Sequence, residues 1–325
     1  MKRIAAVILG IVGILGLAAA APAEAAYPDR TVTIVVPYPA GGPTDQLARV
    51  VAEHLSKKFG QNFIVENVTG GSTIIASNKV AKADPDGYTL LLHNLQISAN
   101  PALFKNLPFD TVKDFKTVIM INRNPLVIVA RPGLDANSLK EFMALMKKQH
   151  LKEALPGFGT TGHLTSRLFA QVTGLKFEEI PYRGGAPAVT DLLGSHDDFM
   201  IGTPQQLLPL VNAGKLKAIA VTQKGKMPEF PHADSMADVL GPKFAIYYWQ
   251  GLFAPSKTPA AIIKTLNAAV NDVANDPAVL KQWHDTGVEA FPKDLRTPAA
   301  SENYLKSEMA RWAKVIKDNN IHANQ

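Results

Sequence analysis

Residues 32–47, VTIVVPYPAGGPTDQL, form the stretch that decides the fold. Its β-branched run at 32–36 predicts a buried strand, and residues 38–42 predict a tight turn after it. Pro43 is typical of the first position of a helix, where a missing N–H costs nothing. Glycines without side chains leave the N–H groups of such a turn open to a small anion. The same residues are equally compatible with a strand–turn–helix joint that binds nothing.

The pattern of strand, glycine turn and helix occurs a second time. Residues 63–65 predict a strand, residues 67–72 (NVTGGS) a turn and residues 74–83 a helix. Two such helix starts, side by side in a parallel sheet, would face one crevice. The polar residues 94–100 are predicted to be irregular and to form a wall of that crevice.

The composition is that of a soluble α/β protein, because 46% of the residues are hydrophobic and 19% are charged. A chain of 325 residues is long enough for two domains. The absence of cysteine excludes disulfides and thiolate metal sites. The net charge of +6 is not gathered into clusters of Lys and Arg with aromatic residues, so we expect no nucleic-acid partner. A modest basic excess favours acidic small molecules instead.

Residues 1–26 are predicted to be a signal peptide. Lys2 and Arg3 precede an apolar segment at 4–21, and Ala23-Glu24-Ala25 fits a small-x-small cleavage site. An apolar segment of about eighteen residues could also span a membrane. The early basic pair and the alanine-rich end favour cleavage, so we expect a mature protein exported to the periplasm.

Two apolar strands are predicted to cross between two domains. The first is interrupted by NRNP at 122–125, and the second is AIYYWQGLF at 245–253. A second α/β series lies between them. These boundaries predict a discontinuous domain 1, residues 27–123 and 250–325, and a domain 2, residues 124–249. Downstream, Thr258 is predicted to cap a long helix that begins at Pro259.

Residues 157–162, GFGTTG, match the dinucleotide fingerprint G-x-G-x-x-G, with Glu178 or Glu179 near the spacing of a ribose-binding acid. The fingerprint must follow a buried strand, and residues 152–156 (KEALP) are not predicted to form one. An exported protein also rarely meets NAD. The chain contains neither G-x-x-x-x-G-K-[ST] nor a G-x-S-x-G elbow. We therefore expect no nucleotide and no other cofactor.

The titratable residues give few signals of chemistry. None of the eight histidines pairs with another at i, i+4 or joins an acidic cluster, so no metal site is predicted. For His163, at the start of a helix, capping or pocket lining is favoured over a role as general base. Arg183, in a Gly-Gly turn after a strand, is either a surface charge or a ligand whose guanidinium matches the two oxygens of a carboxylate.

Several motifs occur together in one order along the chain. They are PAGGPTD at 39–45, NVTGG at 67–71, NP at 100–101 with LPFD at 107–110 and KDF at 113–115, IPYRGGAPA at 180–188, AGKLKAIAVT at 213–222 and WQGLFAP at 249–255. With these motifs the chain resembles the periplasmic solute-binding receptors of tripartite tricarboxylate transporters, also called the Bug family. The resemblance covers residue 27 to the final helix.

The resemblance implies an α/β fold of two doubly wound domains joined by two crossing strands, the flytrap-like periplasmic-binding-protein architecture. It also implies that a monomer captures a small organic carboxylate between its domains and delivers it to membrane permease subunits, without chemistry. The ligand contacts would come from the turns and loops of both domains: Tyr38, Ala40, Gly41, Gly42, Thr44, Asp45, Gly71, Ser72, Gln96, Gly159, Thr160, Thr161, His163, Arg183, Gly184 and Thr203.

Two departures from the family pattern bear on the ligand. The loop at 157–163 is shorter than the usual serine-rich form, so Thr160 and Thr161 must replace serines. Thr203 lies where many relatives place an aspartate that faces the far end of the ligand. An uncharged residue there suits an acidic or apolar group, which favours di- and tricarboxylates or aromatic acids over amino acids.

Two other functions remain as alternatives. One is an exported hydrolase or transferase that uses His163 or Asp45 as a base, although no set of nucleophile, base and orienting group is evident in the sequence. The other is a ligand sensor for a membrane signalling partner, which would use the same cleft. The favoured hypothesis is a carboxylate receptor that is not an enzyme.

Overall fold

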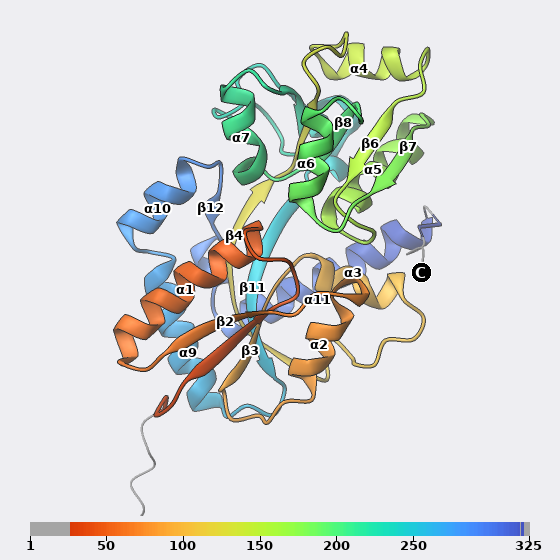
Figure 1. Cartoon of the computed structure of the whole chain (residues 1–325). Coiled ribbons are helices and arrows are strands. Elements are labelled where there is room, and N and C mark those ends of the chain that lie inside the picture. The colour runs from red at the N-terminus through yellow and green to blue at the C-terminus, as the bar shows by residue number, and fades with distance from the viewer. Residues whose placement is uncertain (1–26, 319, 322–325) are drawn as a thin grey trace, which may run out of the picture.

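The computed structural model describes residues 27–318, 320 and 321, so the predicted signal peptide lies outside the described residues. Two six-stranded sheets form the framework, one below the other in Figure 1, with helices packed around each. This arrangement is the predicted α/β architecture of two wound units joined by crossing strands.

The first sheet has the strand order β12-β4-β11-β3-β1-β2. Its strands are β1 (Val32–Val36), β2 (Phe63–Asn67), β3 (Thr89–Asn94), β4 (Phe115–Pro125), β11 (Tyr247–Pro255) and β12 (Glu289–Ala290). β1 runs parallel to β2 and β3, and β11 runs antiparallel to β3 and β4. The helices are α1 (Pro43–Phe59), α2 (Ile74–Ala81), α3 (Gln96–Leu103), α9 (Ala260–Val273), α10 (Pro277–His284) and α11 (Pro298–Asp318), with 3-10 turns at Gly71–Thr73 and Lys293–Leu295.

The second sheet has the order β10-β9-β5-β8-β6-β7. Its strands are β5 (Val127–Ala130), β6 (Lys152–Leu155), β7 (Glu178–Pro181), β8 (Phe199–Gly202), β9 (Lys217–Val221) and β10 (Asp234–Ser235). The helices are α4 (Leu139–Met146), α5 (Thr161–Thr173), α6 (Gly185–Leu193), α7 (Pro204–Asn212) and α8 (Met236–Leu240), with a 3-10 turn at Pro242–Phe244. In both sheets the parallel strands lead into helices at one edge, and these edges face each other across the molecule.

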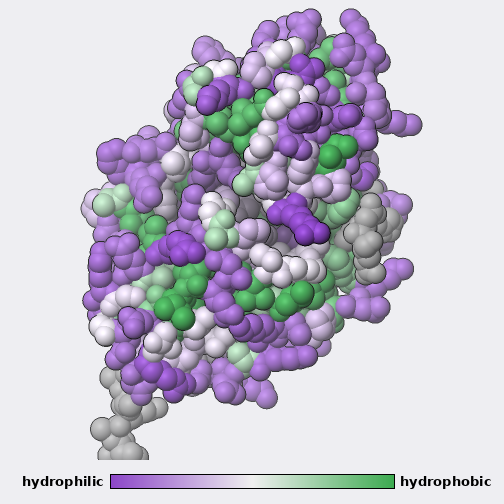
Figure 2. All heavy atoms as spheres, in the orientation of Figure 1, coloured by the Kyte–Doolittle hydropathy of each residue, from purple (hydrophilic) through white to green (hydrophobic). Residues whose placement is uncertain are grey.

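Apolar residues fill both faces of the first sheet. Val51 on α1 and Leu266 on α9 belong to one buried cluster, and Trp249 and Trp312 belong to the other. Glu308 is buried between these two tryptophans and accepts a hydrogen bond from each indole, at 3.1 and 3.2 Å. The face in Figure 2 is largely hydrophilic, with hydrophobic atoms in small separate groups.

The structure differs from the sequence-based prediction in three elements. Residues 152–155 form strand β6, which the prediction missed because Glu153 interrupts its apolar pattern. This carboxyl is fully buried, and burial and the neighbouring Glu179 raise its pKa well above the usual range. The prediction that residues 94–100 are irregular is wrong, because helix α3 begins at Gln96. The N-cap of α9 is Pro259, one residue after the predicted Thr258.

The two sheets are joined where β4 ends and β5 begins, with only Leu126 between them. Thr222, just after β9, holds this joint: its N–H donates to the Leu126 carbonyl at 2.9 Å, and the Leu126 N–H donates to its Oγ1 at 2.8 Å. The same hydroxyl donates to the carbonyl of Ile246 at 2.6 Å, immediately before β11. One buried threonine therefore fastens both connections between the sheets.

Replacing Thr222 by valine removes the hydroxyl while it keeps the shape. The buried Leu126 N–H and Ile246 carbonyl then lose a partner, so we expect the free energy of unfolding to fall by about 1–3 kcal/mol. Urea denaturation followed by circular dichroism measures the change. Thr190→Val, at an exposed position on α6, is the matched control and is expected to change stability little. Equal effects of the two substitutions would contradict the role given to Thr222.

Candidate functional site

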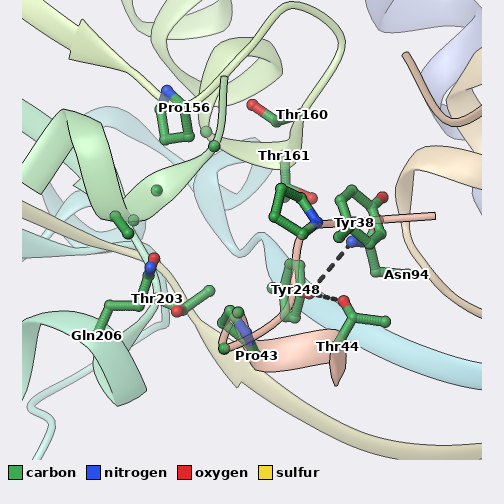
Figure 3. Close-up of a pocket in the computed structure, with 18 of the residues that line it drawn as sticks. Tyr38, Pro43, Thr44, Asn94, Pro156, Thr160, Thr161, Thr203, Gln206 and Tyr248 are labelled. Atoms are coloured by element: carbon green, nitrogen blue, oxygen red, sulfur yellow. Dashed lines mark hydrogen bonds between the residues drawn. The ribbon is translucent and has the colours of Figure 1, made fainter. Parts of the chain in front are cut away.

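A cleft lies between the facing edges of the two sheets. It has two adjoining chambers, of about 160 and 640 Å³, which share Tyr38, Pro39, Pro156, Thr160, Arg183 and Gly184 in their walls. Figure 3 shows the smaller one, which we call the first chamber, and the larger is the second chamber.

Four helices begin at the first chamber, one that follows a strand of the first sheet and three that follow strands of the second. The N-cap residues are Gly42 of α1, Thr160 of α5, Gly184 of α6 and Thr203 of α7, and all four line this chamber. Only Thr160 accepts a hydrogen bond from its own helix, at 3.3 Å from the His163 N–H. The starts of α1, α6 and α7 have no side-chain cap, so their first-turn N–H groups and partial positive charge remain available to an external anion.

Asp45 lies behind the first turn and does not line either chamber. Its carboxylate accepts the Gly41 N–H at 2.9 Å, the Asn67 amide at 3.0 Å and two bonds from Arg49 at 2.9 and 3.0 Å. Asn67 also donates to the Tyr38 carbonyl at 3.0 Å. Burial opposes ionisation, but the hydrogen bonds from Arg49, Gly41 and Asn67 outweigh it and lower the pKa of Asp45. The Gly41 N–H is thus already occupied, and Asp45 supports the turn.

The second turn is held in a left-handed conformation. Gly71, Ser72 and Thr73 have φ values of 54°, 50° and 78°, which are unfavourable for a β-branched residue. Contacts from α3 hold this turn: Asn100 donates to Thr73 Oγ1 at 3.0 Å, and Gln96 donates to the Ser72 carbonyl at 3.2 Å. Gln96 also accepts from the Tyr38 hydroxyl at 3.0 Å, so it links the two turns.

On the opposite wall, two hydroxyls have no partner. Thr161 Oγ1 and Thr203 Oγ1 are buried, line the first chamber and make no hydrogen bond to the described residues. Across from them, Tyr248 Oη lies 2.8 Å from Thr44 Oγ1 and accepts from Asn94 at 3.1 Å, as the dashed lines in Figure 3 mark. These groups are able to hydrogen-bond a polar ligand from both sides.

His163 supports the loop at 157–162 from behind. Its ring is fully buried, and Nδ1 accepts the Gly159 N–H at 3.0 Å. Arg167 Nε lies 3.3 Å from Nε2. Burial, together with the Arg167 charge, lowers the pKa of His163 to about 4, so the ring is neutral at neutral pH. This ring lines neither chamber.

The structure brings most of the predicted site residues together in the cleft. Tyr38, Ala40, Gly41, Gly42, Thr44, Ser72, Gln96, Thr160, Thr161, Arg183, Gly184 and Thr203 line one or both chambers. Asp45, Gly71, Gly159 and His163 lie behind the walls. The prediction missed Asn94, Gln206 and Tyr248. Tyr248 lies in the predicted crossing strand, but no local signal shows that its side chain faces the cleft.

The dinucleotide argument needs one correction. Strand β6 precedes the G-x-G-x-x-G loop and α5 follows it, so the premise that no strand precedes the fingerprint is wrong. Gly162 packs closely on β8, because a Cβ there would lie 2.6 Å from the Ile201 carbonyl. Glu179, the acid near the ribose-binding spacing, forms an ion pair with Arg167 and lines neither chamber.

The walls of the cleft are almost uncharged. Among the described residues that line the two chambers, Arg183 is the only one with a full charge, and none is Asp, Glu, His, Lys or Cys. The described residues contain no group of three or more His, Asp or Glu side chains able to hold a metal ion. In the same part of the chain, no helix has the length and apolarity needed to span a bilayer.

Residues 47–321 match the family described as "Tripartite tricarboxylate transporter family receptor". The chain belongs to this family. The receptor is 33% identical over 322 residues to Protein BugT of Bordetella pertussis, with 98% of each chain covered. The resemblance inferred from the motifs is therefore confirmed.

Solved structures agree with this assignment. The periplasmic binding protein BugD is 32% identical to the receptor, with a TM-score of 0.85 over 91% of this chain and 99% of that one. An R. palustris protein with adipate is 31% identical, with a TM-score of 0.84 over 91% and 99% of the two chains. MatC from Rhodopseudomonas palustris, with bound malate, is 31% identical, with a TM-score of 0.83 over 89% and 100%. The receptor thus has the fold of periplasmic binding proteins.

The pH dependence of the free energy of unfolding tests whether the Asp45 carboxylate supports the turn at residues 38–42. Because the pKa of Asp45 is lowered in the folded state, its stabilising effect is present above the unfolded-state pKa and is lost as pH falls through the folded-state value. We expect Asp45→Asn to lower the free energy of unfolding by about 1–3 kcal/mol at pH 7 and by less at pH values below the ordinary range of an aspartate.

Urea denaturation across this pH range measures the effect of Asp45. Asp84→Asn, in an exposed turn, is the control. A constant difference between the wild type and Asp45→Asn at every pH would contradict the ionised role of the carboxylate.

Proposed function

We propose that the receptor binds a small di- or tricarboxylate, or an aromatic acid, in the cleft. The observation that carries the proposal is the convergence of four helix starts, three of them without a side-chain cap, on one chamber with no acidic residue in its wall. Arg183 adds the one full positive charge. This is an environment that favours an anion and disfavours a cation.

The strength of such binding follows from the number of charged hydrogen bonds. Each bond between an N–H or hydroxyl and a carboxylate contributes roughly 1.5–3 kcal/mol in a closed site. Three to five of them, less the cost of ordering the ligand and the walls, correspond to a dissociation constant of about micromolar or lower. The first chamber, of about 160 Å³, suits one carboxylate group, and the second chamber has room for the remainder of the ligand.

The related structures support this choice of ligand class. The R. palustris protein with adipate and MatC with malate both hold dicarboxylates, and each matches nearly the whole described chain. Thr203 places an uncharged hydroxyl in the first chamber, which gives no counter-ion for the ammonium of an amino acid.

Capture and delivery would involve movement of the two halves. We assign residues 27–123 and 250–325 to one domain and 124–249 to the other, with bending at Leu126 and between Thr222 and Ile246. In this scheme residues 1–26 direct export to the periplasm and are removed, and the closed, loaded receptor delivers its ligand to membrane permease subunits. The alternative of an exported hydrolase or transferase has less support, because neither His163 nor Asp45 lines the cleft.

A substitution at Gly42, the N-cap of α1, tests whether the ligand binds at the start of this helix. Its backbone is extended (φ −76°, ψ 167°), and an added Cβ would lie 3.6 Å from the nearest atom, so a side chain fits. Aspartate is a good N-cap, and its carboxylate would occupy the N–H groups that the ligand needs. We expect Gly42→Asp to weaken carboxylate binding at least tenfold, with an unchanged or higher melting temperature.

Calorimetric titration with adipate, malate, citrate and benzoate measures the effect of Gly42→Asp. Gly42→Ala is the matched control, because it adds a side chain without charge and should bind within about threefold of the wild type. Wild-type protein that binds none of these acids, or Gly42→Asp that binds them unchanged, would refute the proposal.

A substitution at Thr203 tests whether the absence of negative charge in the wall of the first chamber selects an anionic ligand. Thr203→Asp puts a residue type that is favoured at N-cap positions at the start of α7 and places a negative charge in the first chamber. We expect carboxylate affinity at pH 7 to fall at least tenfold through like-charge repulsion. Thr203→Asn, also a capping residue but neutral, should retain most of the affinity. If both substitutions weaken binding equally, the charge of the wall is not what selects the ligand.

A further inference from the structure

A third cavity, of about 280 Å³, lies beside the cleft, between α1, α10 and the start of α7. We call it the side chamber and define it by Leu47, Asn122, Gln205, Gln250, Trp283 and Val288. Pro43, at the start of α1, lines both the side chamber and the first chamber, so the beginning of one helix separates them. In Figure 1, α1, α10 and α7 lie on the left of the molecule.

Three amide oxygens in the wall of the side chamber have no partner. They are Asn122 Oδ1, Gln205 Oε1 and Gln250 Oε1, all buried and without a hydrogen bond to the described residues. Asn122 and Gln250 are 2% and 0% exposed and lie directly opposite each other on β4 and β11. Buried carbonyl groups without partners are costly, and here they belong to three residues that line one cavity.

The amide nitrogen atoms of Gln250 and Gln205 already donate hydrogen bonds within the protein. Gln250 Nε2 donates to Thr44 Oγ1 at 3.2 Å and to Tyr248 Oη at 3.1 Å. Gln205 Nε2 donates to Asn124 Oδ1 at 3.3 Å. Their oxygens are therefore the groups left free, and a hydrogen-bond donor is what they lack. No acidic residue lines the chamber, and Leu47, Val50, Trp283 and Val288 form the apolar part of its wall. Arg49 also lines it, with its guanidinium paired to the Asp45 carboxylate. The other polar lining residues are Gln46, Gln282 and Thr286.

We propose that the side chamber is a second binding site, for a small organic molecule that carries N–H donors, an amine or an amide, on a short apolar chain. The free oxygens accept the N–H groups, and the apolar wall covers the chain. Carboxylates are disfavoured, because the three oxygens would repel them and the charge of Arg49 is already paired with Asp45. This binding step is independent of the function proposed for the cleft.

Occupancy of the side chamber should also affect the cleft, and this part rests on the proposed function. Gln205 belongs to the half that contains the second sheet, whereas the other defining residues belong to the half that contains the first. Gln250 is joined through Thr44 and Tyr248 to Asn94 in the first chamber. A molecule that contacts both halves changes the balance between open and closed forms, and its effect on carboxylate affinity must be reciprocal.

Titration with three probes of equal chain length tests the proposal: n-butylammonium, butyramide and butyrate. Trp283 lines the chamber, and the other two tryptophans are fully buried against Glu308, so tryptophan fluorescence reports on this site. We expect n-butylammonium, butyramide or both to give a saturable change that is absent in Trp283→Phe. A response to the ammonium alone identifies a cation site, and a response to both identifies a site for neutral and charged donors.

Gln205→Met removes one free oxygen at a partly buried position and keeps the length of the side chain. We expect it to weaken binding of the responding probe by about threefold to tenfold, whereas Gln149→Met, on the surface, leaves the affinity unchanged. Calorimetry on Trp283→Phe measures binding without the fluorescent reporter.

Two results would overturn the side-chamber proposal: no saturable response to either donor probe, or a response to butyrate equal to that of the donors. Adipate titration of the same samples keeps the two proposals separate. A protein that binds adipate but no donor probe loses only the side chamber, and one that binds a donor probe but no organic acid loses only the function assigned to the cleft.

Discussion

The first turns of four helices lie around one small chamber, and the rest of the structure must hold these positively polarised helix ends close together. Three of them have no side-chain cap from the described residues, so helix ends with like partial charges are held close together. Such an arrangement persists only if the surrounding structure determines it. The two sheets provide this support, because the carboxyl ends of their parallel strands lead into these helices at facing edges.

The charged and titratable side chains lie mainly behind the walls of the cleft. Asp45 holds the first turn, His163 holds the loop before α5, and Gln96 ties the first turn to the second. Under the proposed function, these residues leave backbone N–H groups and a few hydroxyls as the surface that meets a ligand. A receptor built in this way recognises the shape and charge of an acid, and its side chains give little indication of which acid.

The connections between the two halves share one set of polar contacts. Thr222 binds both connections. On β11, Gln250 lines the side chamber and donates to Thr44 and Tyr248, which line the first chamber. Because buried hydrogen bonds are costly to break singly, bending at this joint is expected to change several of them together. Ligand binding in the cleft and the geometry of the side chamber are thereby physically connected.

Local signals in the sequence were sufficient for the strand, glycine turn and helix at 32–59, because these depend on residues close together in the chain. The family followed from motifs spread along the chain, and the expected contact residues, most of which line the cleft, followed from that resemblance. Strand β6, helix α3 and the positions of Asp45, His163 and Tyr248 were decided only by the tertiary structure. Glu153 lies in a strand as a fully buried carboxyl, and burial and the neighbouring Glu179 raise its pKa. Asp45 is held away from the cleft by Arg49 and Asn67. The direction of a side chain depends on partners distant in the sequence, and local propensity contains no information about them.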